Sequence, residues 1–584
     1  MEGLPPIDFR GELNAEQFAA VTSRPGPALV LAGAGSGKTR TLTYRVAWLL
    51  HQGARPWDIL LLTFTNKSAK EMLERVEDLT AVPRGQFWGG TFHSIGQRIL
   101  RRNAGAAGRQ PDFTILDQKE SEQLFSEVVK ETDGAFIKDK TNPKAAVILD
   151  AYSHARNTLR PLDEVLAERL DWMKGGPEKL LGFCARYEAR KAEGNLCDFD
   201  DLLVLWLKVL ETDPAALAHY RQRFQHILVD EFQDTNRLQS RIIDLLGDRH
   251  QIMAVGDDAQ CIYTWRGADW ENIMAFPQRH PGTEFHHIDT NYRSTPEILA
   301  FANEILRHRP KVDGFDRRLV AVRPPGPPPT VFTVGDTSQQ AKLVGRKILQ
   351  LHHEGHALGD IHVLYRAHYQ SLELQMELNA LGIPFVITSG IRFFEQAHIK
   401  DVAAYLKLIV NPSDELAFKR LAQMLPGVGG KSADTLWNAF SARFLPTSES
   451  TPEFEVSDND GALPAIRPIA PELSAIGRSV PKKAAVAWAQ FTATIAQCES
   501  PERRGQPGRL IRLVLEADYE DYLRKTYENA RNRLEDLAQL AAYADSFEDT
   551  SLFLSELALQ SNLESEQNQA RDGDDEDRLR LSTV

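Results

Sequence analysis

The chain has 584 residues, of which 42% are hydrophobic and 26% are charged, and these proportions are typical of globular proteins. They exclude a disordered chain and a collagen-like chain, and the length allows several hydrophobic cores. The formal net charge of −13 excludes a uniformly basic coat for nucleic acids, but a local cationic groove that holds a polyanion remains open.

Short apolar runs alternate with helical patterns near the start of the chain. A strand is predicted at residues 28–32, where a glycine-rich turn ends it, and a helix follows over 39–52. A second strand at 59–62 and a second helix at 66–79 repeat this order. Such alternation predicts a parallel sheet covered by helices.

The pattern becomes helical over residues 103–195, which are rich in Ala, Glu, Lys, Leu and Arg. We expect an inserted helical subdomain in this segment. Strands are predicted again at 226–229 and 252–255, so the first α/β unit resumes after the insertion.

A proline-rich break at 322–329 (VRPPGPPP) separates this unit from a second one, because so much proline cannot continue a helix or a central strand. A strand at 361–364 and a helix at 370–381 are predicted next. Helical character dominates after Ala397, and we expect a mobile loop at 446–483, where Pro, Ser and acidic residues accumulate.

Four scattered cysteines without C-x-x-C spacing indicate reduced thiols, and the first residues do not have the pattern of a secretory signal. The longest apolar runs are far shorter than the ~20 residues that span a bilayer. We therefore expect a soluble, cytoplasmic protein that does not interact with membranes.

The first strand leads into A-G-A-G-S-G-K-T, which matches the phosphate-loop pattern except that Ala32 replaces the first glycine. Glycines let the backbone N–H groups turn inward around a phosphate, and the next helix points its positive end at the anion. Lys38 is predicted to reach the β- and γ-phosphates, and the Thr39 hydroxyl to bind Mg²⁺. The predicted nucleotide-binding residues are Ala32, Gly33, Ala34, Gly35, Ser36, Gly37, Lys38, Thr39 and Arg40.

An apolar strand also runs into two adjacent carboxylates, in the string H-I-L-V-D-E-F-Q-D at 226–234. Asp230 is predicted to hold Mg²⁺, directly or through water, and Glu231 to act as the general base toward the attacking water. Alone, such a pair is more often a solvated strand end, but beside a phosphate loop the catalytic interpretation is favoured.

Several further strings occur in a characteristic order: L-N-A-E-Q-F-A-A at 13–20, L-T-F-T-N-K-S-A-K at 62–70, G-T-F-H-S at 90–94, D-F-D-D-L-L at 198–203, V-G-D-D-A-Q-C-I-Y-T-W-R-G-A-D at 255–269 and T-N-Y-R-S at 290–294. With V-D-E-F-Q-D, the chain resembles UvrD/Rep/PcrA-type superfamily 1 DNA helicases. The resemblance implies an α/β fold of two RecA-like motor domains that bind ATP between them, and 3′→5′ movement on single-stranded DNA with unwinding at single-strand/duplex junctions.

The resemblance also implies a domain order. We expect the first motor domain at 1–105 and 196–285 with a helical insertion at 106–195. The second motor domain is expected at 286–394 and 576–584, with a helical insertion and mobile loop at 395–575. The family motif H-x-A-K-G-L-E and the motif of a second arginine finger do not occur before Val584, so we expect this domain to be incomplete.

By resemblance, four residues complete the ATP site. Gln17 is expected to read adenine and Tyr292 to stack on it. Gln260 is expected to sense the γ-phosphate, and Arg293 to act as the first arginine finger. A surface helix residue, a core aromatic residue and an ion-pair partner are the plain alternatives for Gln17, Tyr292 and Arg293.

By resemblance, aromatic side chains on loops stack on the bases of a single strand, and nearby polar groups contact its backbone. A glycine turn, L-P-G-V-G-G-K at 425–431, is expected to offer backbone N–H groups to a duplex phosphate, although a simple helix–helix turn is an equal alternative. The predicted DNA-binding residues are Phe64, Thr91, Phe199, Tyr263, Trp265, Arg266, Arg366, Gly427 and Gly429.

The favoured hypothesis is therefore an ATP-dependent DNA helicase or translocase that uses Mg²⁺. A motor with only one arginine finger is expected to hydrolyse ATP poorly, since a finger raises the rate of phosphoryl transfer by a factor of about 10³–10⁵. The second hypothesis is thus a hydrolysis-poor regulatory fragment that binds ATP and DNA. A P-loop kinase or transporter ATPase is a third hypothesis, and the DNA-type strings argue against it.

Overall fold

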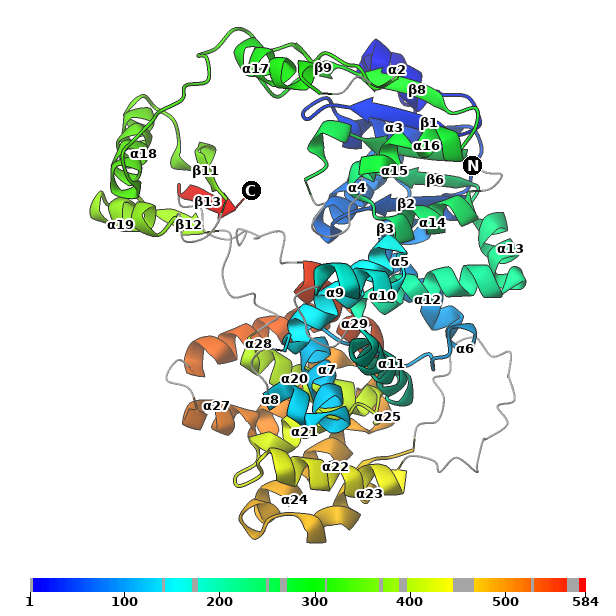
Figure 1. Cartoon of the computed structure of the whole chain (residues 1–584), viewed down its shortest axis with the longest axis vertical. Helices are drawn as coiled ribbons and strands as arrows, with labels where there is room; N and C mark the ends of the chain where they lie inside the picture. The colour runs from blue at the N-terminus through cyan, green and yellow to red at the C-terminus, as the bar shows by residue number, and fades with distance from the viewer. Residues whose placement is uncertain are drawn as a thin grey trace. The chain divides into compact units, whose positions relative to one another are not determined.

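The computed structural model divides into two compact units, one formed by Met1–Pro325 and Ala397–Leu559 and the other by Gly326–Gln396 and Gln560–Val584 (Figure 1). The structure describes residues 4–138, 142–170, 177–247, 251–262, 270–309, 312, 314–366, 371–387, 396–444, 467–526, 530–563 and 577–583. Within these ranges, no helix combines the length and the apolar character that crossing a bilayer requires.

A six-stranded sheet forms the centre of the first unit. Its strands follow the order β3-β2-β6-β7-β1-β8, and each neighbouring pair is parallel. The residues of β1 and β2 are all buried, which explains why these strands are continuous apolar runs in the sequence. The strands are β1 (Ala28–Ala32), β2 (Ile59–Thr63), β3 (Trp88–Thr91), β6 (His226–Val229), β7 (Gln251–Gly256) and β8 (Glu284–Ile288).

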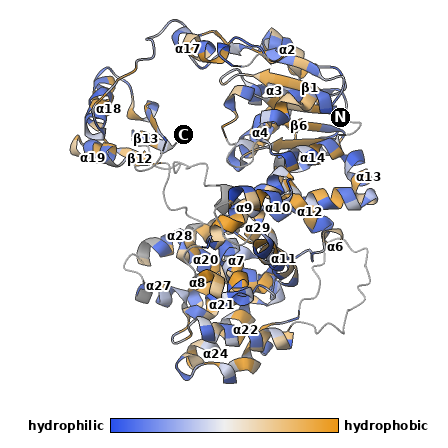
Figure 2. Ribbon diagram, viewed as in Figure 1, coloured by the Kyte–Doolittle hydropathy of each residue, from blue (hydrophilic) through white to orange (hydrophobic). Residues whose placement is uncertain are grey.

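Helices cover both faces of this sheet, and each face has its own hydrophobic core. Leu29 and Leu31 of β1 belong to one core, whereas Ala28 and Val30 belong to the other, because successive side chains of a strand point to opposite faces. Figure 2 shows the strands as mainly hydrophobic and the helices as mixed. The main covering helices are α3 (Lys38–His51), α4 (Asn66–Thr80), α5 (Phe92–Arg102), α12 (Phe199–Thr212), α13 (Pro214–Arg223) and α14 (Arg237–Leu246).

The expected helical segment at 103–195 is confirmed. Two short strands, β4 (Thr114–Ile115) and β5 (Leu196–Cys197), pair in parallel at its two ends and so close the insertion. Its helices are α6 (Ala104–Ala107), α7 (Gln118–Thr132), α8 (Gly134–Lys138), α9 (Ala145–Thr158), α10 (Leu162–Arg169) and α11 (Glu178–Glu193).

A second group of helices, α20 to α29, packs against the first insertion. Leu416 of α21 joins the apolar cluster of the first insertion, and Lys407 of α20 is ion-paired with Glu120 of α7 at 2.6 Å. The helices are α20 (Ala397–Val410), α21 (Glu415–Met424), α22 (Gly430–Phe444), α23 (Ala470–Ala475), α24 (Ala485–Cys498), α25 (Pro501–Arg504), α26 (Pro507–Val514), α27 (Glu520–Thr526), α28 (Ala530–Ala544) and α29 (Thr550–Leu563).

The loop expected at 446–483 is wrong in its second half, while residues 446–466 lie outside the described ranges. Residues 470–484 form α23 and two 3₁₀ turns, Ile476–Ser479 and Lys482–Ala484. Pro471 stands in the first turn of α23, where a missing N–H costs nothing, and Leu473 and Ile476 are buried. The proline thus starts a helix here.

The second unit holds a parallel three-stranded sheet in the order β11-β13-β12. Its strands are β11 (His362–Tyr365), β12 (Phe385–Ile387) and β13 (Leu579–Thr583), and its helices are α18 (Thr337–His353) and α19 (Leu372–Ala380). Leu579 and Leu581 are fully buried in its core. The predicted strand at 361–364 and helix at 370–381 correspond to β11 and α19.

Residues 286–325 belong to the first unit by their contacts, although the sequence analysis assigns them to the second motor domain. β8 is the edge strand of the large sheet, and β9 (Thr290–Asn291) pairs in parallel with β10 (Val320–Ala321). Helix α17 (Pro296–Arg307) lies between β9 and β10 in the chain. This arrangement brings the T-N-Y-R-S string to the same unit as the phosphate loop.

Candidate functional site

The predicted phosphate loop connects β1 to α3 in a turn that suits an anion. Gly35 and Gly37 have φ values of +76° and +89°. The backbone N–H groups of Gly35, Gly37 and Lys38 have no hydrogen-bond acceptor within the described part of the chain. Free N–H groups at the start of a helix form a cradle for phosphate oxygens, so the loop fits a nucleotide.

Lys38 and Glu231 are in contact at the edge of the sheet where β1 and β6 end. The Nζ atom of Lys38 lies 2.6 Å from Oε2 of Glu231, and the lysine side chain is only 10% exposed. The Nε2 group of Gln233 also donates to Oε2 of Glu231, at 2.8 Å. Glu231 has a φ of +47°, a left-handed conformation that is strained for a residue with a side chain. The phosphate-loop lysine and the predicted general base are therefore in direct contact.

Asp230 directly follows β6 and is 4% exposed. Burial, together with the neighbouring Glu231, raises the pKa of Asp230 to about 7, and the same two causes raise the pKa of Asp234 to about 7. A divalent cation would offset this concentration of carboxylates. Asp230 and the Thr39 hydroxyl fit Mg²⁺, which binds one or two carboxylates together with substrate phosphates.

Gln17 and Tyr292, the two residues expected around adenine, are both hydrogen-bonded to residues of the phosphate loop or beside helix α2 (Ala15–Val21). Helix α2 begins after Asn14, whose Nδ2 group donates to the Tyr292 hydroxyl at 2.9 Å. Gln17 is buried, and its Nε2 group donates to the Ser36 carbonyl of the phosphate loop at 2.9 Å. Tyr292 is 47% exposed, so its side chain is accessible to a ligand.

Asn291 fixes the T-N-Y-R-S string on the phosphate loop. Its Nδ2 group donates to the Ala34 carbonyl, and its Oδ1 atom accepts from the N–H groups of Arg293 and Ser294 at 3.0 and 2.7 Å. The Tyr292 N–H donates to the Gly35 carbonyl at 2.9 Å. Sequence reasoning did not single out Asn291, although it stands inside the string that carries Tyr292 and Arg293.

Gln260 is linked to Glu231 by hydrogen bonds. Its Nε2 group donates to Asp257 at 2.5 Å, and the Asp257 N–H donates to Oε1 of Gln233 at 2.9 Å. Gln233 in turn holds Glu231. Gln233 therefore connects the expected γ-phosphate sensor to the expected base, and its place within V-D-E-F-Q-D was the only sequence signal for it.

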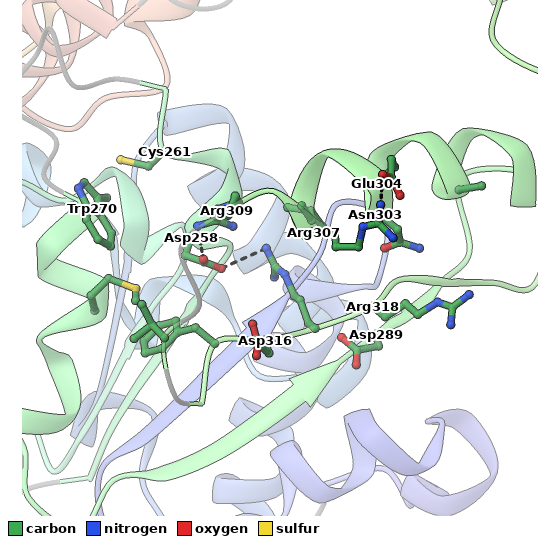
Figure 3. Close-up of a pocket in the computed structure, with 16 residues that line it drawn as sticks. Asp258, Cys261, Trp270, Asp289, Asn303, Glu304, Arg307, Arg309, Asp316 and Arg318 are labelled. Carbon is green, nitrogen blue, oxygen red and sulfur yellow. Dashed lines mark hydrogen bonds and ion pairs between the residues drawn. The ribbon is translucent and has the colours of Figure 1, made fainter.

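A pocket of about 970 Å³ adjoins this linkage (Figure 3). Asp258 pairs there with Arg309 at 2.5 Å and with Arg317 at 3.2 Å, and Arg317 also pairs with Asp257. Cys261 and Trp270 lie on one side of these charges, and Asn303 and Glu304 of α17 on the other. The ion pairs tie the segment after α17 to the turn that carries Gln260.

Three described residues that are predicted to bind DNA lie at or just after the carboxyl ends of β2 and β3 and at the start of α12. Phe64 and Phe199 are half-buried. The ring of Phe199 contacts that of His93, to which no role was assigned from the sequence, with ring centroids 4.7 Å apart and ring planes tilted by 35°. Thr91 is buried, and its hydroxyl accepts from the Ser94 N–H to cap α5. Tyr263, Trp265 and Arg266 lie outside the described residues.

Four other predicted residues belong to other elements of the structure: Arg40, Arg366, Gly427 and Gly429. Arg40 contacts the Glu12 carbonyl and the Tyr44 ring and hydroxyl. Arg366 is exposed at the end of β11 in the second unit. Gly427 has a φ of +82°, and it lies with Gly429 in the turn between α21 and α22.

Replacing Gly35 by alanine is expected to lower nucleotide affinity about tenfold or more. A Cβ at Gly35 would lie 2.4 Å from the Cβ of Arg293, and the left-handed backbone adds about 1–2 kcal/mol of strain. Gly53→Ala is the matched control, because Gly53 has a φ of +96° but open space around it. Titration with a fluorescent ATP analogue tests this, and equal affinities of the two variants would contradict it.

Comparison with known families covers nearly the whole chain. Residues 13–281 match the model of the UvrD/REP helicase N-terminal domain, and residues 286–584 match the UvrD-like helicase C-terminal domain. The ATP-dependent DNA helicase PcrA of Bacillus subtilis is 36% identical over 430 residues, which are 73% of this chain and 57% of that protein. The PcrA proteins of Staphylococcus epidermidis and Staphylococcus aureus are 33% identical over 427 and 429 residues, again 73% of this chain, and 57% and 58% of their own lengths.

The chain thus spans somewhat more than half the length of the curated relatives it matches. The matching models account for the two RecA-like motor domains implied by the order of the motifs. On the combined match of both domains, the chain belongs to the UvrD/REP helicase family.

Proposed function

We propose that the chain binds ATP and Mg²⁺ and couples ATP hydrolysis to 3′→5′ movement on single-stranded DNA, with unwinding at junctions. The observation that carries this proposal is the 2.6 Å contact between Lys38 and Glu231, which joins a nucleotide cradle to a catalytic carboxylate. The relatives described above are named ATP-dependent DNA helicases, which supports the same activity. The motor-domain and insertion boundaries given in the sequence analysis are part of this proposal.

In the proposed reaction, the chain's own groups position a triphosphate and activate water. Lys38 would pair with the β- and γ-phosphates, and this second anion would free Glu231 from the lysine. Glu231, still oriented by Gln233, would then accept a proton from the attacking water. Arg293 would steady the transferred phosphoryl group.

Mg²⁺ would be held by the Thr39 hydroxyl and Asp230, and it would neutralise negative charge on the phosphates. Gln17 and Tyr292 would bind the base, since both already contact elements beside the loop. Gln260 would report the state of the γ-phosphate to Glu231 through Asp257 and Gln233.

For the DNA strand, Phe64 and Phe199 are proposed as stacking platforms, together with Tyr263 and Trp265. Aromatic stacking tolerates any base, as movement along a strand requires. Thr91, Arg266 and Arg366 are proposed to contact the strand, and Gly427 and Gly429 to contact a duplex phosphate.

The alternative function is ATP and DNA binding with poor hydrolysis. ATP turnover measured with and without single-stranded DNA separates the two functions. Turnover that rises at least tenfold with an oligonucleotide supports the motor, and strand separation of 3′-tailed but not 5′-tailed duplexes supports the polarity.

Phe199→Ala is expected to weaken binding of single-stranded DNA about 5- to 150-fold, because each stacked base contributes about 1–3 kcal/mol. Fluorescence anisotropy of a labelled oligonucleotide measures the change. Trp57→Ala is the matched control, since Trp57 is 39% exposed and precedes β2, whereas Phe64 follows the other end of the same strand. Equal losses in the two variants would contradict a stacking role for Phe199.

A further inference from the structure

One side chain of the helical insertion joins α12, which begins with Phe199, to residues 230–236, which carry the predicted base Glu231. The Nδ2 group of Asn157, in α9, donates to Oδ1 of Asp200 in α12 at 2.8 Å. The Oδ1 atom of Asn157 accepts from Nδ2 of Asn236, which begins α14, at 2.8 Å. Asn157 thus uses its donor toward one element and its acceptor toward another.

The Asp200 end of this connection lies at the predicted DNA platform. Asp200 follows Phe199 in the first turn of α12, and the ring of Phe199 contacts that of His93. Asp198 caps the same turn by accepting from the Asp201 N–H at 2.9 Å. A displacement of the Phe199 ring therefore moves a short, capped helix start as a whole.

The Asn236 end lies close to the predicted base. Tight backbone bonds connect them: the Asp234 N–H donates to the Glu231 carbonyl at 2.9 Å, and the Thr235 N–H to the Phe232 carbonyl at 3.2 Å. Asn236 itself is 8% exposed and caps α14 by accepting from the Gln239 N–H at 2.8 Å. A shift of Asn236 is consequently passed to Glu231 by a stiff turn.

Buried ion pairs hold Asn157 in place. The adjacent Arg156 donates to Asp201 at 2.5 Å and lies 3.5 Å from Asp198, so α9 and the start of α12 are fastened together. Asn157 also donates to the Ser153 carbonyl of its own helix at 3.0 Å. The hydrogen bond with Asn236 leads from this fastened pair to the segment 230–236, which carries Glu231.

We propose that Asn157 is a positioning residue that transmits DNA binding at Phe199 to the base Glu231. The inference rests on the proposed function, because it concerns how DNA accelerates ATP hydrolysis. Asn157 would act through its hydrogen bonds with Asp200 and Asn236. It belongs to the helical insertion, so the insertion takes part in coupling.

A carboxylate–amide exchange tests this connection. Asn157→Asp keeps the acceptor for Asn236 but places a second negative charge against Asp200. Asp200→Asn alone keeps an acceptor oxygen for Asn157. In the double variant, the new amide at 200 can donate to the new carboxylate at 157, which restores the contact with its direction reversed.

With the 584-residue chain and a single-stranded oligonucleotide, Asn157→Asp is expected to lower DNA-stimulated turnover about tenfold. Turnover without DNA is expected to stay within about twofold of wild type. Asp200→Asn alone is expected to have an effect below about threefold, and the double variant to recover most of the stimulation. A role in stability alone would lower both rates together and would not be rescued.

Two results would overturn the inference but not the proposed function, provided that DNA stimulates turnover by the wild type. One is full DNA stimulation in Asn157→Asp, and the other is a double variant whose stimulation is no higher than that of Asn157→Asp. A wild type whose turnover ignores DNA contradicts the proposed function, and the inference fails with it. If Asn157→Asp does not fold, Asn236→Ser decides, because serine keeps the cap on α14 but lacks the amide donor. Unchanged DNA stimulation in Asn236→Ser then overturns the inference.

Discussion

Replacing Glu231 by glutamine is expected to lower ATP turnover about 10²–10⁴-fold, the usual contribution of a general base. The amide oxygen can still accept from Lys38 and Gln233, so the loop geometry is retained while the proton acceptor is lost. Affinity for ATP is therefore expected to stay within about threefold of wild type. Turnover by phosphate release and affinity by titration with a labelled analogue measure the two quantities.

Glu211→Gln is the control for this variant, since Glu211 is an exposed α12 residue paired with Arg241 at 3.2 Å. It is expected to leave both quantities unchanged, because exposed ion pairs contribute little. Unchanged turnover in Glu231→Gln would refute the assignment of the base. A parallel fall in affinity and turnover would instead assign Glu231 to nucleotide binding.

Replacing Lys191 by methionine is expected to destabilise the first unit by about 3–5 kcal/mol. The Nζ atom of Lys191 is fully buried and lies 2.6 Å from Asp198 and 2.7 Å from Asp201. Burial disfavours ionised Asp201, but Lys191 and Arg156 outweigh it and hold the pKa of Asp201 below its usual range. Without the lysine, two buried carboxylates would share one arginine.

Thermal unfolding followed by circular dichroism measures this loss. Lys179→Met is the matched control, because Lys179 lies on the same helix α11 and also pairs with an aspartate, Asp133. Its side chain, however, is 53% exposed. The control is expected to change stability by less than about 1 kcal/mol. Equal melting temperatures for the two variants would show that the buried network does not contribute to the stability of the unit.

Local patterns in the sequence were sufficient for the parts of the fold that local rules govern. The predicted strand at 226–229 coincides with β6, and α3 begins one residue before its prediction, at Lys38. The phosphate loop and the acidic pair each have a distinct local signature, so their residues could be named before their contact was known. Their meeting follows from the parallel sheet, in which strand ends of the same kind share one edge.

Contacts that depend on distant partners could not be predicted in this way. Asn291 and Gln233 bind backbone groups or side chains whose positions are set by the whole sheet. The ion pairs of Lys191 with Asp198 and Asp201 join α11 to the start of α12, and no local pattern in either segment predicts this pairing. A loop is expected at 446–483 because Pro, Ser and acidic residues accumulate there, whereas Pro471 stands in the first turn of a helix.

The position of β1 also has a consequence for biosynthesis. Both of its neighbours in the sheet come much later in the chain, since Ala28 pairs with Met253 and with Glu284. At typical elongation rates of about 5–20 residues per second, the nascent strand waits on the order of 10–50 s at the ribosome before it can be enclosed. During that interval its apolar side chains require shielding, and a ligand of the adjoining loop cannot yet assist folding.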